Sequence, residues 1–223
     1  LPADELNSKI DEPFVPLATV SAPEAGQFDA WKKNLLAELR RVSFGYFPEK
    51  IPAAKPLGDS KFDTQRLQSE EGIEFRLHYG GSMNGKPKDV LLVVLNEDEV
   101  DALPESINKL ESSEGIVVLC QPRGIGETRW TRKNGPNDVE RAHAVLGRTV
   151  GAGRVWEVLA AAKYLSSKYA DGDKKPSVRV WGSGPAGLIA AYAAALDDSI
   201  AGVTLVAPPK THMDPAAPQF LNI

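Results

Sequence analysis

A glycine-rich stretch near the C-terminal end of the chain has the residue spacing of two different functional turns. Residues 182–187 read GSGPAG and lie between a short apolar run, residues 178–181, and a segment rich in alanine and leucine. An apolar run, a glycine turn and an alanine-rich segment predict a strand, a tight turn and a helix. Such a turn can bind a pyrophosphate through the pattern G-x-G-x-x-G, or hold a nucleophilic serine through the pattern G-x-S-x-G.

One alternative is a dinucleotide-binding turn formed by Gly182, Gly184 and Gly187. Its glycines would let a pyrophosphate approach the N-terminus of the following helix. The pattern also requires an acidic residue about 20 positions further on, at the end of the next strand, to bind the ribose. Here that strand ends in residues 207–209 (APP), and the turn does not lie on the first strand of its unit. A dinucleotide-binding module is therefore the second alternative to the main prediction.

The other alternative is a nucleophile turn, and it places a glycine where the serine should be. In such a turn the residues two before and two after the nucleophile must be small. Aligning the apolar run with the strand puts Gly182 and Ala186 at these two positions and Gly184 at the nucleophile position. Ser183 lies one place early, with bulky residues where small ones are needed. We therefore expect Ser183 to bond local backbone as a turn serine, and regard a catalytic Ser183 as the less favoured alternative.

Two polar residues after the last predicted strand could also carry chemistry. His212 and Asp214 form an H-x-D pair at the edge where open α/β sheets place their sites. Such a pair could bind a metal or act as a base with its orienting acid. Because the sequence shows no third ligand, we predict no metal and expect these residues to cap a turn.

We expect the remaining residues that could carry chemistry to have structural roles. His78 is predicted on the exposed side of a strand, and His143 on or packed against a helix surface. Glu127 lies among arginines and is expected to form ion pairs. Trp130 and Trp156 could line a sugar-binding cleft, although the position of Trp156 in its helix favours the core.

Composition limits the class of protein and its partners. The 223 residues are 42% hydrophobic and 25% charged, which is typical of a soluble globular protein. The net charge is −4 and basic blocks are short, so nucleic acid and anionic membranes are not expected partners. No apolar run approaches the roughly 20 residues needed to span a bilayer. The single cysteine, Cys120, excludes an internal disulfide and is expected to be buried.

The order of predicted elements indicates one domain over residues 28–223, preceded by a proline-containing linker at 1–27. Residues 28–42 predict an amphipathic helix packed on the body, and residues 44–59 a surface connection. A hairpin of half-exposed strands is predicted at 66–71 and 73–79. Buried strands and helices then alternate, with strands at 90–95, 116–120, 178–181 and 202–207 and helices at 100–110, 139–148, 154–169 and after 187. This order predicts an α/β fold, a mostly parallel sheet with helices on both faces.

Several segments in this order resemble a known family. Residues 123–126 (RGIG) follow a buried strand, residues 146–165 contain most of the next long helix, and the glycine turn and residues 187–212 come after it. These segments resemble the acetyl xylan esterase and dienelactone hydrolase branch of the α/β-hydrolases, over roughly residues 62–223. The resemblance implies an α/β-hydrolase fold that stops after the sixth of its usual strands. It also implies that Arg123 is a structural brace near the site.

The resemblance implies ester substrates, but three features argue against activity. Such enzymes need a nucleophile, a histidine oriented by an acid, and an oxyanion hole. The family's serine corresponds to Gly184, the strands that carry the acid and the histidine are not found, and residues 97–99 (EDE) put negative charge near the oxyanion site. We therefore expect a hydrolase-like domain without its own serine chemistry, a pseudoenzyme or a companion domain of a larger esterase. The main alternative is an active esterase on acetylated carbohydrate or small esters.

The chain begins with Leu1 rather than methionine, so we expect it to be a piece of a longer protein with a neighbouring domain. A secreted or periplasmic location is implied by the family resemblance alone. No cofactor is predicted.

Overall fold

The computed structural model describes residues 2, 4–6, 21–58, 63–80, 85–101, 103, 105–108, 115–130 and 138–212. The chain divides into two compact units, Leu1–Glu38 and Leu39–Ile223. The second unit contains the sheet. Its helices and strands are β1 (Lys55–Pro56), β2 (Thr64–Glu70), β3 (Ile73–Tyr79), β4 (Asp89–Val94), α3 (Glu105–Asn108), β5 (Gly115–Gln121), η2 (Gly126–Thr128), α4 (Asp138–Val145), α5 (Val150–Lys168), β6 (Ser177–Ser183), α6 (Gly184–Leu196) and β7 (Ile200–Val206).

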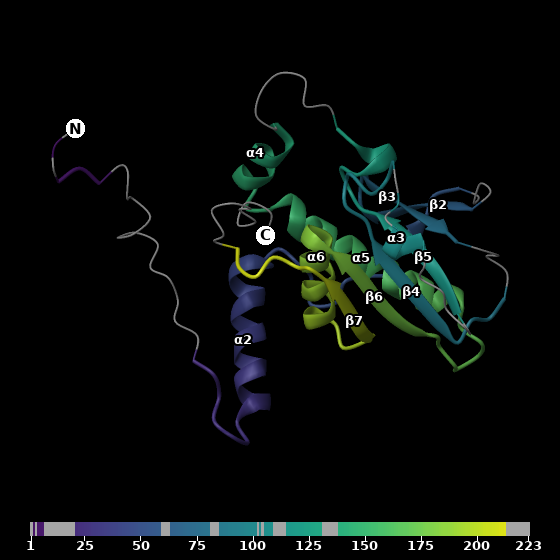
Figure 1. Cartoon of the computed structure of the whole chain (residues 1–223), viewed down its shortest axis with the longest axis horizontal. Helices are drawn as coiled ribbons and strands as arrows, with labels where there is room; N and C mark the ends of the chain where they lie inside the picture. The colour runs from purple at the N-terminus through teal and green to yellow at the C-terminus, as the bar shows by residue number, and fades with distance from the viewer. Residues whose placement is uncertain are drawn as a thin grey trace. The chain divides into compact units, whose positions relative to one another are not determined.

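A mixed seven-stranded sheet forms the centre of this unit (Figure 1). Its strand order is β1-β2-β3-β5-β4-β6-β7. The pairs from β1 to β5 are antiparallel, whereas β5, β4, β6 and β7 run parallel to one another. The predicted hairpin followed by a parallel α/β arrangement is therefore confirmed, and the sequence analysis missed only the two-residue strand β1.

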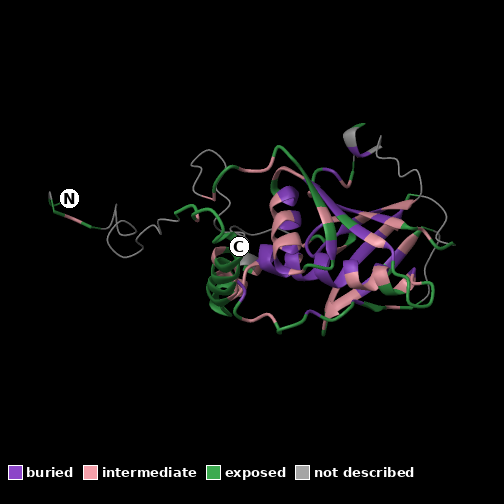
Figure 2. Ribbon diagram, turned by 90° about the horizontal axis from the view of Figure 1, so that it is seen from below, coloured by how far each residue is buried: buried purple, intermediate pink, exposed green. Residues whose placement is uncertain are grey.

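Helices cover both faces of the sheet. Helices α5 and α6 pack on one face, where they share the main hydrophobic core with β2 to β6. Helix α3 lies on the other face, where Ile107 joins a smaller cluster with Val93, Leu95 and Trp181. Figure 2 shows buried residues filling the sheet and the helices packed against it. This arrangement confirms the predicted fold class.

Helix α5 is the most deeply buried helix of the described residues. Its N-cap, Thr149, accepts a hydrogen bond from the Ala152 N–H through its side-chain oxygen at 3.0 Å, which satisfies one of the free amides of the first turn. One apolar stripe of the helix is buried throughout. Its buried members are Val155, Val158, Leu159, Ala162 and Leu165.

Helix α2 (Phe28–Ser43) confirms the helix predicted at residues 28–42. Leu39, in its C-terminal half, packs against the main core of the second unit. The following segment, predicted as a surface connection, contributes Phe44 and Ile51 to the same core. The hydrophobic period predicts the helix correctly because it depends on local spacing, but it does not specify what the next segment contacts.

The last strand, β7, corrects a prediction. Residues 202–207 read as a buried strand, yet β7 lies at the edge of the sheet beside β6. Val203, Leu205 and Val206 are 39%, 38% and 40% exposed. A short apolar run is the same in the sequence whether one or both of its edges are paired, so it does not distinguish an edge strand from a central one.

Strand β3 is more buried than its alternating sequence predicts. It lies between β2 and β5. Arg76 on its supposedly exposed side is only 8% exposed and forms an ion pair with Glu127 of η2 at 3.2 Å. His78 is half-buried rather than exposed, and its Nδ1 is hydrogen-bonded to Thr64 Oγ1 at 3.0 Å. Charged and polar residues can lie on this covered face of β3 because ion pairs and hydrogen bonds compensate for the cost of burying them.

The helix predicted over residues 100–110 is also shorter than expected. Within the described part of this segment, α3 covers only Glu105–Asn108, and residues 102, 104, 109 and 110 lie outside the described residues.

Candidate functional site

The glycine turn joins β6 to α6, as predicted, and it has the backbone form of a strained turn. Gly184 has φ 47°, in the left-handed region that favours glycine. A Cβ built on Gly184 would have no atom within 4 Å, so its side-chain direction is open. A Cβ on Gly182 would lie 2.6 Å from the carbonyl oxygen of Ala186. A left-handed conformation at residue 184, which would be strained for any residue other than glycine, and a residue at 182 that must be small match a nucleophile turn with Gly184 at the nucleophile position.

Ser183 does not bond local backbone, which corrects the role predicted for it. Its hydroxyl donates to Glu99 Oε1 at 2.5 Å, across 84 residues of sequence. Asn96 Nδ2 donates to the Ser183 carbonyl oxygen at 3.0 Å. Ser183 makes no side-chain capping bond to α6. The three residues Asn96, Glu99 and Ser183, which we call the latch, connect the loop after β4 to the turn.

The backbone amides that an oxyanion hole would use are either bonded within the latch or, at Pro185, absent. In the α/β-hydrolases that the sequence resembles, the hole consists of the backbone N–H after the nucleophile and an N–H from the loop that corresponds to 95–99 here. The residue after Gly184 is Pro185, which has no N–H. The next amide, of Ala186, donates to Asn96 Oδ1 at 2.9 Å. The Asn96 N–H donates to Glu99 Oε2 at 2.7 Å. Each of these amides is therefore engaged within the protein.

Glu99 gives the acidic loop a different role from the one predicted. The sequence predicts that residues 97–99 oppose a developing negative charge. In the structure Glu99 is only 6% exposed and turns inward to accept three hydrogen bonds from the latch. Glu97 instead forms an ion pair with Arg129 at 3.4 Å.

The latch predicts a graded loss of stability. Ser183→Ala removes one donor from Glu99 and should lower the free energy of unfolding by about 1 kcal/mol. Glu99→Ala leaves the Asn96 N–H without its acceptor and should cost roughly 2 kcal/mol. Urea unfolding of each variant measures the difference. Ser167→Ala, on an exposed part of α5, is the matched control and should leave the unfolding midpoint almost unchanged. Equal midpoints for Ser183→Ala and wild type would contradict a stabilising latch.

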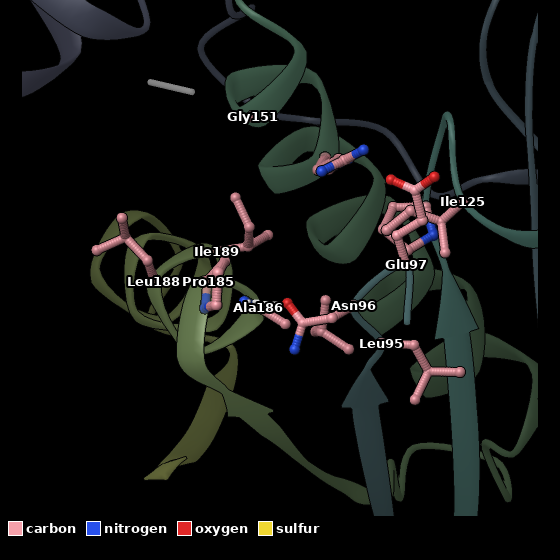
Figure 3. A pocket seen from close by; sticks show the side chains of 12 residues that line it. Leu95, Asn96, Glu97, Ile125, Gly151, Pro185, Ala186, Leu188 and Ile189 are labelled. Atoms are coloured by element: carbon pink, nitrogen blue, oxygen red, sulfur yellow. Dashed lines mark hydrogen bonds between the residues drawn. The ribbon is translucent and has the colours of Figure 1, made fainter. Parts of the chain in front are cut away.

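A small pocket lies beside the turn, at the carboxyl ends of the parallel strands (Figure 3). Its volume is about 50 Å³, enough for a few water molecules, whereas pockets that enclose small organic ligands have about 300–1,000 Å³. Figure 3 shows Asn96 beside Ala186 at the start of α6, where their hydrogen bond closes one side. The pocket is lined by Val94, Leu95, Asn96, Glu97, Pro122, Ile125, Gly151, Arg154, Pro185, Ala186, Leu188 and Ile189. An acetylated sugar does not fit inside it.

Arg123 forms a buried ion pair behind this pocket, the kind of brace expected for it. Its Nε donates to Glu157 Oε1 and its Nη2 to Glu70 Oε1, both at 2.7 Å, and its N–H donates to Glu157 Oε2 at 2.7 Å. Arg148 also pairs with Glu70 at 3.0 Å. Burial raises the pKa of Glu157, which is 0% exposed, and the charge of Arg123 opposes that rise. The network ties β2 and the RGIG turn to α5.

The predicted H-x-D pair lies only partly within the described residues. His212 Nε2 is hydrogen-bonded to Tyr192 Oη at 2.9 Å. Tyr192 comes eight residues after Gly184 on α6, which is about 12 Å along the helix axis. Asp214 lies outside the described residues. The structure thus places His212 on Tyr192 and gives it no hydrogen bond to the described residues of the turn.

The other sequence candidates have structural contacts. Trp156 is 8% exposed and belongs to the core, so it does not line a cleft, while Trp130 is half-buried beside the RGIG turn. Cys120 is fully buried, as predicted, and burial raises the pKa of its thiol. His143 Nδ1 bonds the Val139 carbonyl oxygen at 2.7 Å within α4. Glu127 is the ion-pair partner predicted, although with an arginine of β3.

The described residues contain no group of three or more histidine, cysteine, aspartate or glutamate side chains that could hold a metal ion. Among the helices that the structure describes, none combines the length and apolar character needed to cross a membrane.

The antiparallel hairpin, the parallel strands and the strand–turn–helix at β6 together define an α/β-hydrolase fold. Neither protein-family models nor curated proteins match the chain. Among solved structures, a candidate acetyl xylan esterase from Bacteroides fragilis matches with a TM-score of 0.54 and 15% identity, over 79% of this chain and 52% of that one. The chain therefore spans about half the length of that protein.

Two other solved structures give weaker matches. A glucuronoyl esterase from Solibacter usitatus matches with a TM-score of 0.48 and 16% identity, over 86% of this chain and 64% of its own. Acetyl xylan esterase 1 from Thermoanaerobacterium sp. JW/SL YS485 matches with a TM-score of 0.44 and 16% identity, over 83% and 58%. At such identities the likeness shows the fold and not the activity.

Proposed function

We propose that this α/β-hydrolase-like domain does not carry out serine hydrolysis itself and acts as a non-catalytic companion of an esterase. The observation that carries the proposal is the pair Gly184–Pro185. The first residue has no nucleophile, and the second has no N–H to donate to an oxyanion.

The size of these losses supports the proposal. Serine hydrolases form a covalent intermediate, for which glycine offers no atom. Removing one oxyanion donor lowers kcat by about 10²–10³ in a serine hydrolase. Here one donor is absent at Pro185, and the neighbouring amides of Ala186 and Asn96 are engaged by the latch. Restoring any single one of these features would therefore leave the others missing.

The companion role rests on a likeness of fold. The candidate acetyl xylan esterase from Bacteroides fragilis shares the fold of this chain, and this likeness supports an ester-processing partner. The proline-containing residues 1–27, predicted as a linker, support attachment to a neighbouring domain.

The test uses p-nitrophenyl acetate and a fluorophosphonate probe on the intact chain. Wild type should show no turnover above buffer and no labelling. Gly184→Ser should remain unlabelled, because its hydroxyl would have space but no free oxyanion donors. A fluorophosphonate-sensitive esterase of the same fold class serves as the positive control. Labelling of the wild type with turnover of the ester would contradict the proposal.

A second candidate function is an active esterase that uses Ser183. The short hydrogen bond from its hydroxyl to Glu99 favours this candidate, since a carboxylate can act as a general base. The position of Ser183, one residue before the strained Gly184, and its bonds to the latch argue against it. The fluorophosphonate assay also decides this case, because the adduct would be found on Ser183.

The dinucleotide alternative has weaker support. A pyrophosphate would need free amides at the start of α6, where Pro185 has none and the Ala186 N–H is bonded to Asn96. The next strand, β7, also ends without an acidic residue.

A further inference from the structure

Another pocket, larger than the one beside the turn, lies at the C-terminal end of α6. Its volume is about 300 Å³, within the range of pockets that enclose small organic ligands. It is lined by residues of α5, the end of α6 and the loop after it, Arg40 of α2 and residues 49–51, all within the second unit. Leu196 of this lining is twelve residues after Gly184, about 18 Å along the axis of α6. A ligand here would therefore bind independently of any chemistry at the glycine turn.

Buried aliphatic side chains form part of the pocket wall. Ile51, Leu159 and Leu196 line the pocket and are only 5%, 2% and 7% exposed. Transfer of an aliphatic group from water to such a wall is favourable, because apolar surface is removed from water on both sides. The pocket can therefore take the aliphatic part of a ligand.

The charged side chains of the lining are balanced in sign. Three are cationic and three are anionic, namely Arg40, Lys50, Lys163, Glu49, Asp197 and Asp198. A ligand with only a negative charge would face three carboxylates, and a ligand with only a positive charge would face three cationic groups. A ligand that carries one charge of each sign can place each charge beside its opposite.

Two of the six charged groups are already bonded to each other. Lys163 Nζ lies 2.9 Å from Asp197 Oδ2 and donates to the Ile51 carbonyl oxygen at 2.8 Å. Asp197 Oδ1 accepts a hydrogen bond from the Ser199 N–H at 2.9 Å. Burial alone would raise the pKa of Asp197, but the hydrogen bonds from Ser199 and Lys163 lower it overall, so the carboxylate stays ionised. This pair is neutral as a whole and leaves the other charged groups to bind a ligand.

Arg40 is a half-buried cation without a carboxylate partner among the described residues. Its Nη2 donates to the carbonyl oxygen of Leu196, at the C-terminal end of α6, where cations are favourable. A guanidinium carries several N–H donors in a planar fork that matches a carboxylate, and the bond to Leu196 uses only Nη2. Arg40 can therefore donate further hydrogen bonds to a ligand carboxylate.

Asp198 brings a carboxylate to the same end of the pocket. It is exposed and forms no ion pair with the residues that the structure describes. It follows Leu196 by two residues, so at most about 7 Å of backbone separates it from the carbonyl group that binds Arg40. The C-terminal end of α6 also favours an ammonium group at this position. Arg40 and Asp198 thus offer one partner for a carboxylate and one for an ammonium group, close together.

We propose that this pocket binds a free α-amino acid with an aliphatic side chain. In such a ligand the carboxylate and the ammonium group share one carbon atom, which suits the short spacing of the two protein charges. The carboxylate accepts hydrogen bonds from Arg40, and the ammonium group donates to Asp198. The aliphatic side chain contacts Ile51, Leu159 and Leu196.

The test is isothermal titration calorimetry of the intact chain with L-leucine and three analogues that each lack one part of it. They are 4-methylpentanoic acid, without the ammonium group, 3-methylbutylamine, without the carboxylate, and glycine, without the side chain. L-leucine should bind saturably to one site, and each analogue should bind at least about tenfold more weakly, since each loses a charge-assisted hydrogen bond or the apolar contact. The proposal is overturned if L-leucine, L-isoleucine and L-valine all fail to bind, or if either the acid or the amine binds as tightly as L-leucine.

Two variants assign the charged groups of the ligand to their partners. Arg40→Gln should bind L-leucine no more tightly than 3-methylbutylamine, and Asp198→Asn no more tightly than 4-methylpentanoic acid. Arg41→Gln, the next residue of α2, and exposed Asp173→Asn lie outside the pocket lining and should bind L-leucine as the wild type does. If Arg40→Gln alters the unfolding midpoint, the exposed Asp198→Asn carries the test alone. A wild-type preference for L-leucine over the acid that persists in Asp198→Asn would contradict the proposal.

Discussion

Arg123→Met should lower the free energy of unfolding by about 3–5 kcal/mol at pH 7.5. The reason is not the loss of attraction alone. Glu157 is 0% exposed, and without Arg123 its carboxylate remains buried with a backbone N–H at 2.7 Å and Ser69 at 3.4 Å as hydrogen-bond partners and Arg154 as the remaining nearby positive charge. Glu70 also loses its bond to Arg123, although Arg148 still pairs with it. Urea unfolding, followed by circular dichroism, measures the change.

The control is the double variant Arg123→Met with Glu157→Leu. It removes both charges and replaces them with apolar side chains of similar volume. Its stability should lie much closer to wild type than that of the single variant, because no buried charge remains uncompensated. If the double variant is as unstable as Arg123→Met, then lost packing, and not the unpaired carboxylate, explains the loss.

The deficit of Arg123→Met should also shrink as the pH falls. Burial raises the pKa of Glu157 above its ordinary value, and Arg123 is the main group that opposes the rise. Without Arg123 the folded-state pKa is raised further. A carboxyl whose folded pKa exceeds its unfolded pKa stabilises the protonated folded state, and that stability is lost as the pH rises through the folded pKa. The cost measured at pH 5 should therefore be smaller than at pH 7.5, and an equal cost would contradict an unpaired Glu157.

Gly182→Ala should lower the free energy of unfolding by about 3 kcal/mol, the upper end of the usual cost of overpacking. Its Cβ would lie 2.6 Å from the Ala186 carbonyl oxygen and 2.8 Å from the Gly187 nitrogen. Both are backbone atoms, so no rotamer change relieves the clash. The turn between β6 and α6 must shift instead, and thermal unfolding should report the loss.

Gly184→Ala is the matched control two residues away. Its Cβ would meet no atom within 4 Å, and its cost comes only from the positive φ of 47°, about 1–2 kcal/mol for a residue other than glycine. Gly182→Ala should therefore be the more damaging of the two. The reverse order would mean that the turn relieves the clash at residue 182 and that the positive φ of residue 184 is the more costly constraint.

The sequence predicts the fold well because the relevant signals are local. The apolar run before residue 182, the glycine turn and the alanine-rich segment after it identify β6 and α6 without any distant contact. The edge position of β7 and the covered face of β3 do not follow from local signals. They depend on which strands lie beside β7 and β3, and the period of apolar residues does not contain that information.

The candidate site likewise has features that the sequence predicts and features that only the folded chain shows. Gly184 at the nucleophile position follows from the spacing of small residues. The missing N–H of Pro185 is also visible in the sequence, as a proline directly after that position. The bonds of Asn96 and Glu99 to the turn were not readable, because 84 residues separate Glu99 from Ser183. Only the packing of β4 beside β6 brings them together.

The latch makes the turn between β6 and α6 depend on a distant part of the chain. The amides of Asn96 and Ala186 both donate hydrogen bonds that hold this turn together. A substitution that frees either amide would give up that stability, and proteins have little stability to spare. Selection acting on single steps therefore favours keeping the turn as it is.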